Sequence, residues 1–162
     1  MERLCIPDHP NPLARKPWVA IVRGARWHIA GDGLVLAAKR ISETDTVIRN
    51  PTQSVSEFLS TDPAGFQSTG KVLWRLVSGA RPRRLRCRGG VIEGRFDAGR
   101  LGNVWIDRSA LQAALAALDV DPEAPCRIEA EKVIRIFGSG WRIALLPVPG
   151  PGAESPKIEE AA

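Results

Sequence analysis

The chain has 162 residues, of which 44% are hydrophobic and 25% charged, and its formal net charge is +5. That length is enough for one domain with a real core and is short for two. Three scattered cysteines without a Cys-x-x-Cys pair argue against a disulfide framework and a zinc site, and no apolar run approaches the roughly 18 residues that span a bilayer. With no signal-peptide pattern at the start of the chain, we expect a soluble, cytoplasmic protein without a membrane partner.

Three prolines within residues 1–16 predict an extended N-terminal arm. A single α+β domain is expected over residues 17–147. Residues 148–162 are rich in Pro, Gly and acidic side chains and contain too few apolar residues to pack, so they are expected to form a disordered tail.

The first part of the domain is dominated by β-strand signals. Residues 18–22 and 26–30 predict two strands joined by a turn at Arg23-Gly24-Ala25. Asp32-Gly33 predicts a hairpin between the second of these strands and residues 34–38. We expect a type I′ turn there, because both central positions of that turn need positive φ.

The next stretch predicts a short strand and two helices. Residues 46–49 form the expected strand, which Asn50-Pro51 ends. The loop-like stretch 51–70 contains one apolar patch at helical spacing, around residues 55–59, which predicts a short helix. Residues 71–78 carry the apolar stripe of a longer one.

Positive charge is concentrated in residues 71–100, which hold nine basic side chains against two acidic ones. Their net charge of +7 exceeds that of the whole chain, so the rest of the protein is close to neutral. In residues 84–88 basic and apolar residues alternate, and alternate residues of a strand face opposite sides. Three guanidiniums should therefore share one face while Leu85 and Cys87 point to the core. A positive face of this kind favours polyanions or an acidic protein surface.

The basic strand should turn at Gly89-Gly90 and return over residues 91–96. In that register Arg86 lies opposite Glu93, a cross-strand pair typical of a solvated outer face. Arg84 lies opposite Arg95, and like charges directly opposed indicate an anionic ligand between them. Three interpretations stay open: binding of an anion or nucleic acid, binding of an acidic protein, and a merely solvated face. The candidate contact residues are Arg81, Arg83, Arg84, Arg86, Arg88 and Arg95.

The last third of the domain predicts a strand at 104–106 and a helix over 109–118, capped by Asp107 or Ser109. Three further strands should form a meander, at residues 126–130, 133–137 and 141–146. The whole pattern predicts an α+β fold, with antiparallel sheet and two main helices packed on one face.

Taken together, residues 104–118 and 141–147 resemble the last βαβββ unit of the bacterial DNA polymerase sliding clamp family. In that family a strand leads into a helix of the pattern apolar-x-x-apolar-Leu, and a three-strand meander closes the unit. The resemblance covers residues 103–147 and implies a non-enzymatic, DNA-associated scaffold with a clamp-like unit at its C-terminal end. One domain cannot encircle a duplex, so a ring would require a closed assembly, paired through 104–106 or 141–146. We expect a monomer or homodimer rather than a ring.

No set of residues predicts catalysis, a metal site or a cofactor. Cys5-x-x-x-His9 has possible metal-ligand spacing but lacks two further donors. His28, beside Trp27 in an alternating strand, is typical of a half-buried structural histidine. Gly31-Asp32-Gly33 is not a phosphate loop, because no helix follows it.

The function expected from the sequence is therefore that of a non-enzymatic, nucleic-acid-associated binding protein that uses the basic hairpin face. The alternative is a small phage- or plasmid-type regulator, an anti-defence-like inhibitor that binds a host nucleic-acid-processing protein through the same face. Base-specific recognition is not indicated, because neither a recognition helix nor a stacking aromatic motif accompanies the charge.

Overall fold

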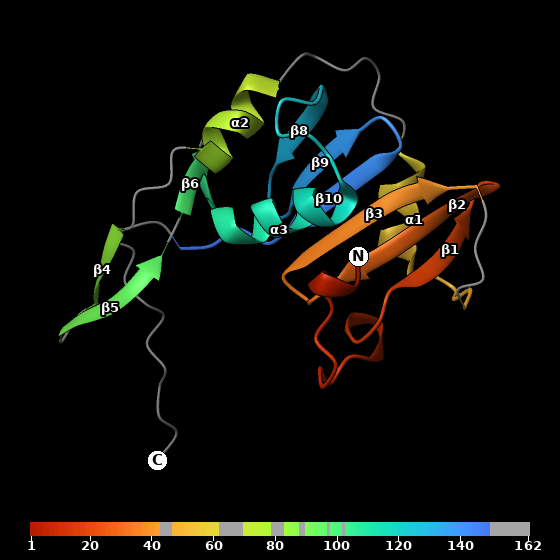
Figure 1. Cartoon of the computed structure of the whole chain (residues 1–162), viewed down its shortest axis with the longest axis horizontal. Helices are drawn as coiled ribbons and strands as arrows, with labels where there is room; N and C mark the ends of the chain where they lie inside the picture. Colours follow the sequence, from red (N-terminus) through yellow and green to blue (C-terminus); the bar gives the residue numbers. More distant parts are fainter. Residues whose placement is uncertain are drawn as a thin grey trace.

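The fold is α+β and is built on a six-stranded antiparallel sheet (Figure 1). The computed structural model describes residues 1–42, 47–61, 70–78, 83–87, 90–96, 98–101 and 103–149. The sheet contains β1 (Trp18–Val22), β2 (Ala25–Gly31), β3 (Val35–Ile41), β8 (Cys126–Ala130), β9 (Ile134–Gly138) and β10 (Trp141–Leu145). Their order across the sheet is β1-β2-β3-β10-β9-β8. Five of these strands lie within about a residue of the ranges expected from the sequence, and β3 extends three residues beyond the expected end at residue 38.

The last strand, β10, lies in the middle of the sheet. It pairs with β3 on one side, where Ile143 faces Ala37, and with β9 on the other, where Ile143 faces Ile136. The N-terminal strands and the C-terminal meander therefore form one continuous sheet. Residues 141–146, considered above as a pairing edge for a ring, are an interior strand.

Both N-terminal hairpins form, but the type I′ turn is not at Asp32-Gly33. It is in the first hairpin, where Arg23 and Gly24 both have positive φ, at 49° and 77°. In the second hairpin only Gly33 has positive φ, which matches a type II′ turn with glycine at its first central position. The Asp32 side chain explains the difference, because its Oδ1 accepts the backbone N–H groups of Leu34 and Val35 at 2.8 and 2.9 Å.

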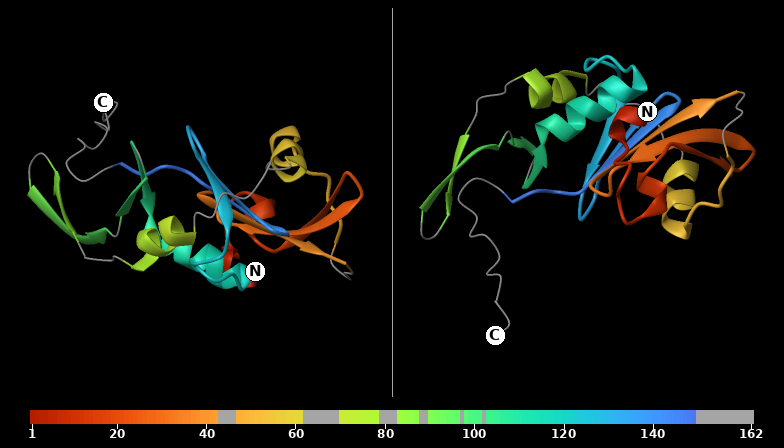
Figure 2. Two further views of the ribbon diagram at one scale, coloured as in Figure 1. Left: turned by 90° about the horizontal axis from the view of Figure 1, so that it is seen from above. Right: turned by 60° about the horizontal axis from the view of Figure 1, so that its bottom comes forward.

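Two of the three helices lie over one face of the sheet, and the third lies over the other face (Figures 1 and 2). Helix α3 (Arg108–Leu118) packs on β3 and β10, and α2 (Gly70–Ser78) lies beside α3 on the same side. Helix α1 (Gln53–Ser60) packs against β1 on the other face. The sheet is thus buried on both faces.

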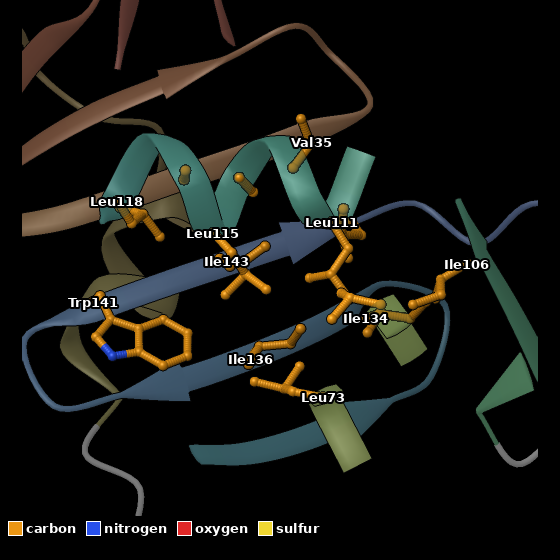
Figure 3. Close-up of a cluster of buried hydrophobic side chains, with 14 of the residues drawn as sticks. Val35, Leu73, Ile106, Leu111, Leu115, Leu118, Ile134, Ile136, Trp141 and Ile143 are labelled. Carbon is orange, nitrogen blue, oxygen red and sulfur yellow. The ribbon is translucent and has the colours of Figure 1, made fainter. Parts of the chain in front are cut away.

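The core under α3 joins the N-terminal segment, α2, α3 and one face of the sheet (Figure 3). Leu115 from α3, Leu73 from α2 and Ile136 and Ile143 from the sheet converge in it, and all four are buried. Trp141 closes one end of this core. A Cβ atom at Gly138, its cross-strand partner, would overlap the Trp141 indole, so glycine is required there.

The second core, on the α1 face, is rich in aromatic side chains. Trp18, Trp27 and Phe137 from the sheet pack with Phe58 and Leu59 from α1. The Phe58 and Phe137 ring centroids are 5.5 Å apart and tilted by 54°, an arrangement that aromatic pairs favour.

Residues 1–16 do not form the extended arm expected from their prolines. They contain two short 3₁₀ turns, η1 (Glu2–Leu4) and η2 (Pro12–Ala14). Leu4 and Ala14 are buried, and Leu4 belongs to the core under α3. Burial of these apolar side chains fixes the segment on the sheet, and proline suits the first position of η2 because it needs no N–H there.

The other end of the chain follows β10 outward. The N–H of Val148 bonds to the carbonyl of Trp105 at 2.9 Å. The remaining part of the expected tail, residues 150–162, lies outside the described residues.

Two short ribbons stand apart from the six-stranded sheet. One pairs β4 (Arg83–Cys87) with β5 (Gly90–Phe96), and the other pairs β6 (Ala98–Leu101) with β7 (Val104–Asp107). The clamp-like order of strand, helix and meander is present, but β7 pairs with β6 and not with the sheet. The clamp-like unit is therefore not confirmed.

Candidate nucleic-acid interface

The β4–β5 ribbon carries four of the six arginines that the sequence singles out. Arg83, Arg84 and Arg86 belong to β4 and Arg95 to β5. Arg81 and Arg88 lie outside the described residues. Both views in Figure 2 show the ribbon at the end of the molecule opposite β1 and α1.

The register of the ribbon differs from the expected one. Cys87 pairs with Gly90, and Arg86 pairs with Val91 rather than with Glu93. Each of these residues thus lies opposite a residue two positions earlier in β5 than expected. The expected Arg86–Glu93 pair is not formed.

The expected opposition of Arg84 and Arg95 falls in an irregular stretch of the ribbon. The pairing is irregular between Arg83 and Leu85, because Arg83 pairs with Phe96 while Leu85 pairs with Ile92. Arg84 has no single partner in this register. Such irregularities bend a strand and increase its twist. An anion held between Arg84 and Arg95 therefore stays a prediction, and the charge density of the ribbon does not depend on the register.

The charge density of the ribbon is high. Its two strands together contain four arginines and one glutamate, a net charge of +3 over twelve residues. Guanidinium groups bind phosphate oxygens through a planar fork of N–H donors. A two-stranded ribbon is one of the shapes that the major groove of B-form DNA admits.

A further arginine, Arg142 on β10, is buried and has a structural environment. Its guanidinium lies 5.2 Å from the Trp27 ring centroid and 5.4 Å from that of Phe137. It donates to the carbonyls of Gly138 at 2.7 Å and Thr61 at 3.2 Å. Since Thr61 caps the C-terminal end of α1, this side chain ties α1 to the sheet. Only 8% of Arg142 is exposed, so it does not add to a surface for polyanions.

The residues considered for metal binding or catalysis have ordinary environments. The His9 Nδ1 atom accepts the N–H of Asn11 at 3.0 Å. Burial raises the pKa of the Cys5 thiol, and burial lowers the pKa of the half-buried His28. Among the described residues, no three His, Cys, Asp or Glu side chains lie together in a way that could hold a metal ion.

A cavity of about 320 Å³ lies on the α1 face of the sheet, between η2, α1 and the ends of β3 and β10. Its walls include Leu13, Trp18, Val55 and Ala144. These residues are far apart in the sequence and no motif joins them, so sequence reasoning missed this site.

No family model matches the chain, and neither a curated protein nor a solved structure matches it. The resemblance of residues 103–147 to a clamp unit therefore stays a prediction. In the part of the chain that the structure describes, no helix is long and apolar enough to cross a membrane.

Proposed function

We propose that this protein is a non-enzymatic nucleic-acid-binding protein whose contact element is the β4–β5 ribbon. The observation that supports the proposal is the excess of positive charge, four arginines against one glutamate, on a ribbon that is separate from the six-stranded sheet. The set of contacts proposed is Arg81, Arg83, Arg84, Arg86, Arg88 and Arg95.

The expected mode of binding is sequence-independent contact with the phosphate backbone. Each phosphate neutralised by an arginine releases condensed counterions, so affinity should fall steeply as the salt concentration rises. The wide major groove of B-form DNA admits a two-stranded ribbon, whereas the major groove of A-form RNA is too narrow for protein side chains to read. Duplex DNA is therefore the favoured partner.

The test compares DNA binding by two double variants, one with two ribbon arginines replaced and one with two arginines replaced elsewhere. Arg84→Glu with Arg86→Glu should lower affinity for duplex DNA at about 50 mM salt and reduce the slope of log affinity against log salt by about 2. The control pair, Arg26→Glu with Arg40→Glu, makes the same change in net charge at exposed positions of the six-stranded sheet. The control should leave the slope almost unchanged. Fluorescence anisotropy with a labelled duplex measures both.

A wild-type protein that binds neither DNA nor RNA at about 50 mM salt would exclude the nucleic-acid proposal. The same ribbon would then be tested as the contact surface of a small phage- or plasmid-type regulator. In that case a protein partner should be recovered from a nuclease-treated host lysate, and the Arg84→Glu, Arg86→Glu variant should fail to recover it.

The clamp-like part of the proposal is separable from the ribbon. It is supported by the order strand, helix and three-strand meander over residues 103–147. It requires a closed assembly large enough to surround DNA, whereas ribbon binding requires no assembly. Oligomeric state, measured by light scattering, therefore distinguishes the two.

A further inference from the structure

The cavity on the α1 face has an almost entirely apolar wall. Leu13 of η2, Trp18 and Ile29 of the sheet and Val55 of α1 contribute to it, and none of its lining residues is charged. Its volume of about 320 Å³ lies near the lower end of the range of about 300–1,000 Å³ found for small-ligand sites.

Water is a poor occupant of this cavity. The volume corresponds to roughly ten water molecules at liquid density, but apolar walls offer them few hydrogen-bond partners. Two exposed leucines also belong to the lining. Leu34 is 66% and Leu146 46% exposed, and the Leu146 N–H bonds to the Leu34 carbonyl at 3.0 Å, which holds the two residues side by side. An apolar ligand would cover this surface and release the water.

Two polar side chains line the cavity, and both have their acceptor atoms engaged. Asn11 Oδ1 accepts the N–H of Leu13 at 3.0 Å, and Thr52 Oγ1 accepts the N–H of Val55 at 3.4 Å. These bonds cap η2 and α1. Neither the Asn11 Nδ2 group nor the Thr52 hydroxyl donates to another residue that the structure describes. Both residues are exposed, so these donors are accessible to a ligand at the mouth of the cavity.

We propose that this cavity binds an uncharged, largely apolar small molecule that carries a hydrogen-bond acceptor, such as a carbonyl oxygen, at one end. The apolar part of the ligand lies against the partly exposed side chains of Leu13, Val55 and Ala144, and the acceptor meets Asn11 Nδ2. This site is distinct from the β4–β5 ribbon and does not depend on the proposed nucleic-acid function.

The probes are benzophenone and diphenylmethane, two molecules of similar shape of which only benzophenone has a carbonyl. Titration followed by two-dimensional proton–nitrogen NMR gives the affinity and the location together. Both probes should shift the amide signals of residues around the cavity and leave those of α3 unchanged. If neither probe shifts these signals at its solubility limit, the proposal is wrong.

Two variants separate the apolar contact from the hydrogen bond. Ala144→Leu adds bulk to the cavity wall. It should lower the affinity for both probes by about tenfold or more, which corresponds to a loss of about 1.4 kcal/mol of binding free energy. Ala116→Leu makes the same change at an exposed position of α3 and should have no effect.

Asn11→Asp keeps an oxygen that caps η2 but removes the Nδ2 donor. It should lower the affinity for benzophenone about three- to tenfold and leave the affinity for diphenylmethane unchanged. Equal affinities of the wild-type and Ala144→Leu proteins would place the probes elsewhere and overturn the proposal. The Arg84→Glu, Arg86→Glu ribbon variant should bind both probes normally, so failure here and failure of the nucleic-acid proposal remain distinguishable.

Discussion

Arg142 shows how one side chain holds two layers of this molecule together. A guanidinium is planar and presents several N–H donors at fixed angles, so it can stack on aromatic rings while it bonds to backbone carbonyls. Arg142 does both, between Trp27 and Phe137 and toward Gly138 and Thr61. Lysine has the same charge but neither the planar surface nor the spread of donors.

We therefore expect Arg142→Lys to lower the free energy of unfolding by about 2–3 kcal/mol, because hydrogen bonds from a charged donor to carbonyls are lost. Arg135→Lys, at an exposed position of the neighbouring strand β9, is the control and should change stability by less than about 0.5 kcal/mol. Urea denaturation measures both. An Arg142→Lys protein as stable as the wild type would show that the carbonyl contacts contribute little.

At the scale of elements, α3 illustrates how a helix begins and ends. Asp107 Oδ1 accepts the N–H of Ala110 at 3.2 Å, which makes Asp107 the N-cap. At the other end Asp119 adopts a left-handed conformation with φ of 55°, and Lys39 Nζ donates to the Leu118 carbonyl at 3.2 Å. The sequence had left Asp107 and Ser109 open as caps, and the structure selects Asp107.

Asp107→Ala should accordingly cost about 1 kcal/mol of stability, the usual effect of losing an N-cap. Asp107→Ser should restore most of it, since serine caps helices nearly as well. Ser109→Ala is the matched control at the rejected position and should be nearly neutral. Thermal unfolding monitored by circular dichroism distinguishes these outcomes, and equal losses for Asp107→Ala and Ser109→Ala would contradict the assignment.

Most elements were predictable because their signals are local. The stripe formed by Leu111, Leu115 and Leu118 defines α3, and all six strands of the main sheet carry regular apolar patterns. β6 was missed, since Ala-Gly-Arg-Leu has no β-branched or aromatic residue. The arm expected over residues 1–16 was wrong because burial of Leu4 is a tertiary effect that proline content does not reveal.

The candidate sites were less accessible to sequence reasoning than the fold. Clustering of arginine predicted a basic ribbon, but Arg86 pairs with Val91 and not with Glu93, and no local pattern in the sequence fixed that register. The cavity depends on η2, α1 and β10 meeting over one sheet face. Residues distant in sequence supply its walls, so no local spacing could predict it.

For the whole molecule, the two edge strands of the sheet are the places where another copy could pair. At the β1 edge, Val19 forms a parallel bridge with Ile48, which covers part of that strand. At the opposite edge, β8 carries Arg127 and Glu129, whose side chains form a salt bridge at 2.9 Å. Charged side chains on an edge strand discourage pairing with another copy.

We expect the wild-type protein to be a monomer or homodimer by light scattering across a range of concentrations. Arg127→Val with Glu129→Val should increase concentration-dependent association, because it leaves an apolar edge. Glu57→Val with Arg75→Val, which removes one charge of each sign from exposed helix positions, is the control. A ring formed by the wild-type protein would favour the clamp-like proposal. If the Arg127→Val, Glu129→Val variant associates no more than the wild type, these charges do not protect the edge.

The central position of β10 has a consequence for how the protein is made. Val35 pairs with Leu145. During synthesis β3 therefore has no partner on that side until nearly all of the described chain has left the ribosome. During that interval the edge of β3 that later pairs with β10 is open to non-native pairing. Long-range pairing of this kind also slows folding. The sheet should therefore close late and in a single cooperative step, and loss of β10 would leave two half-sheets with exposed edges rather than a smaller stable domain.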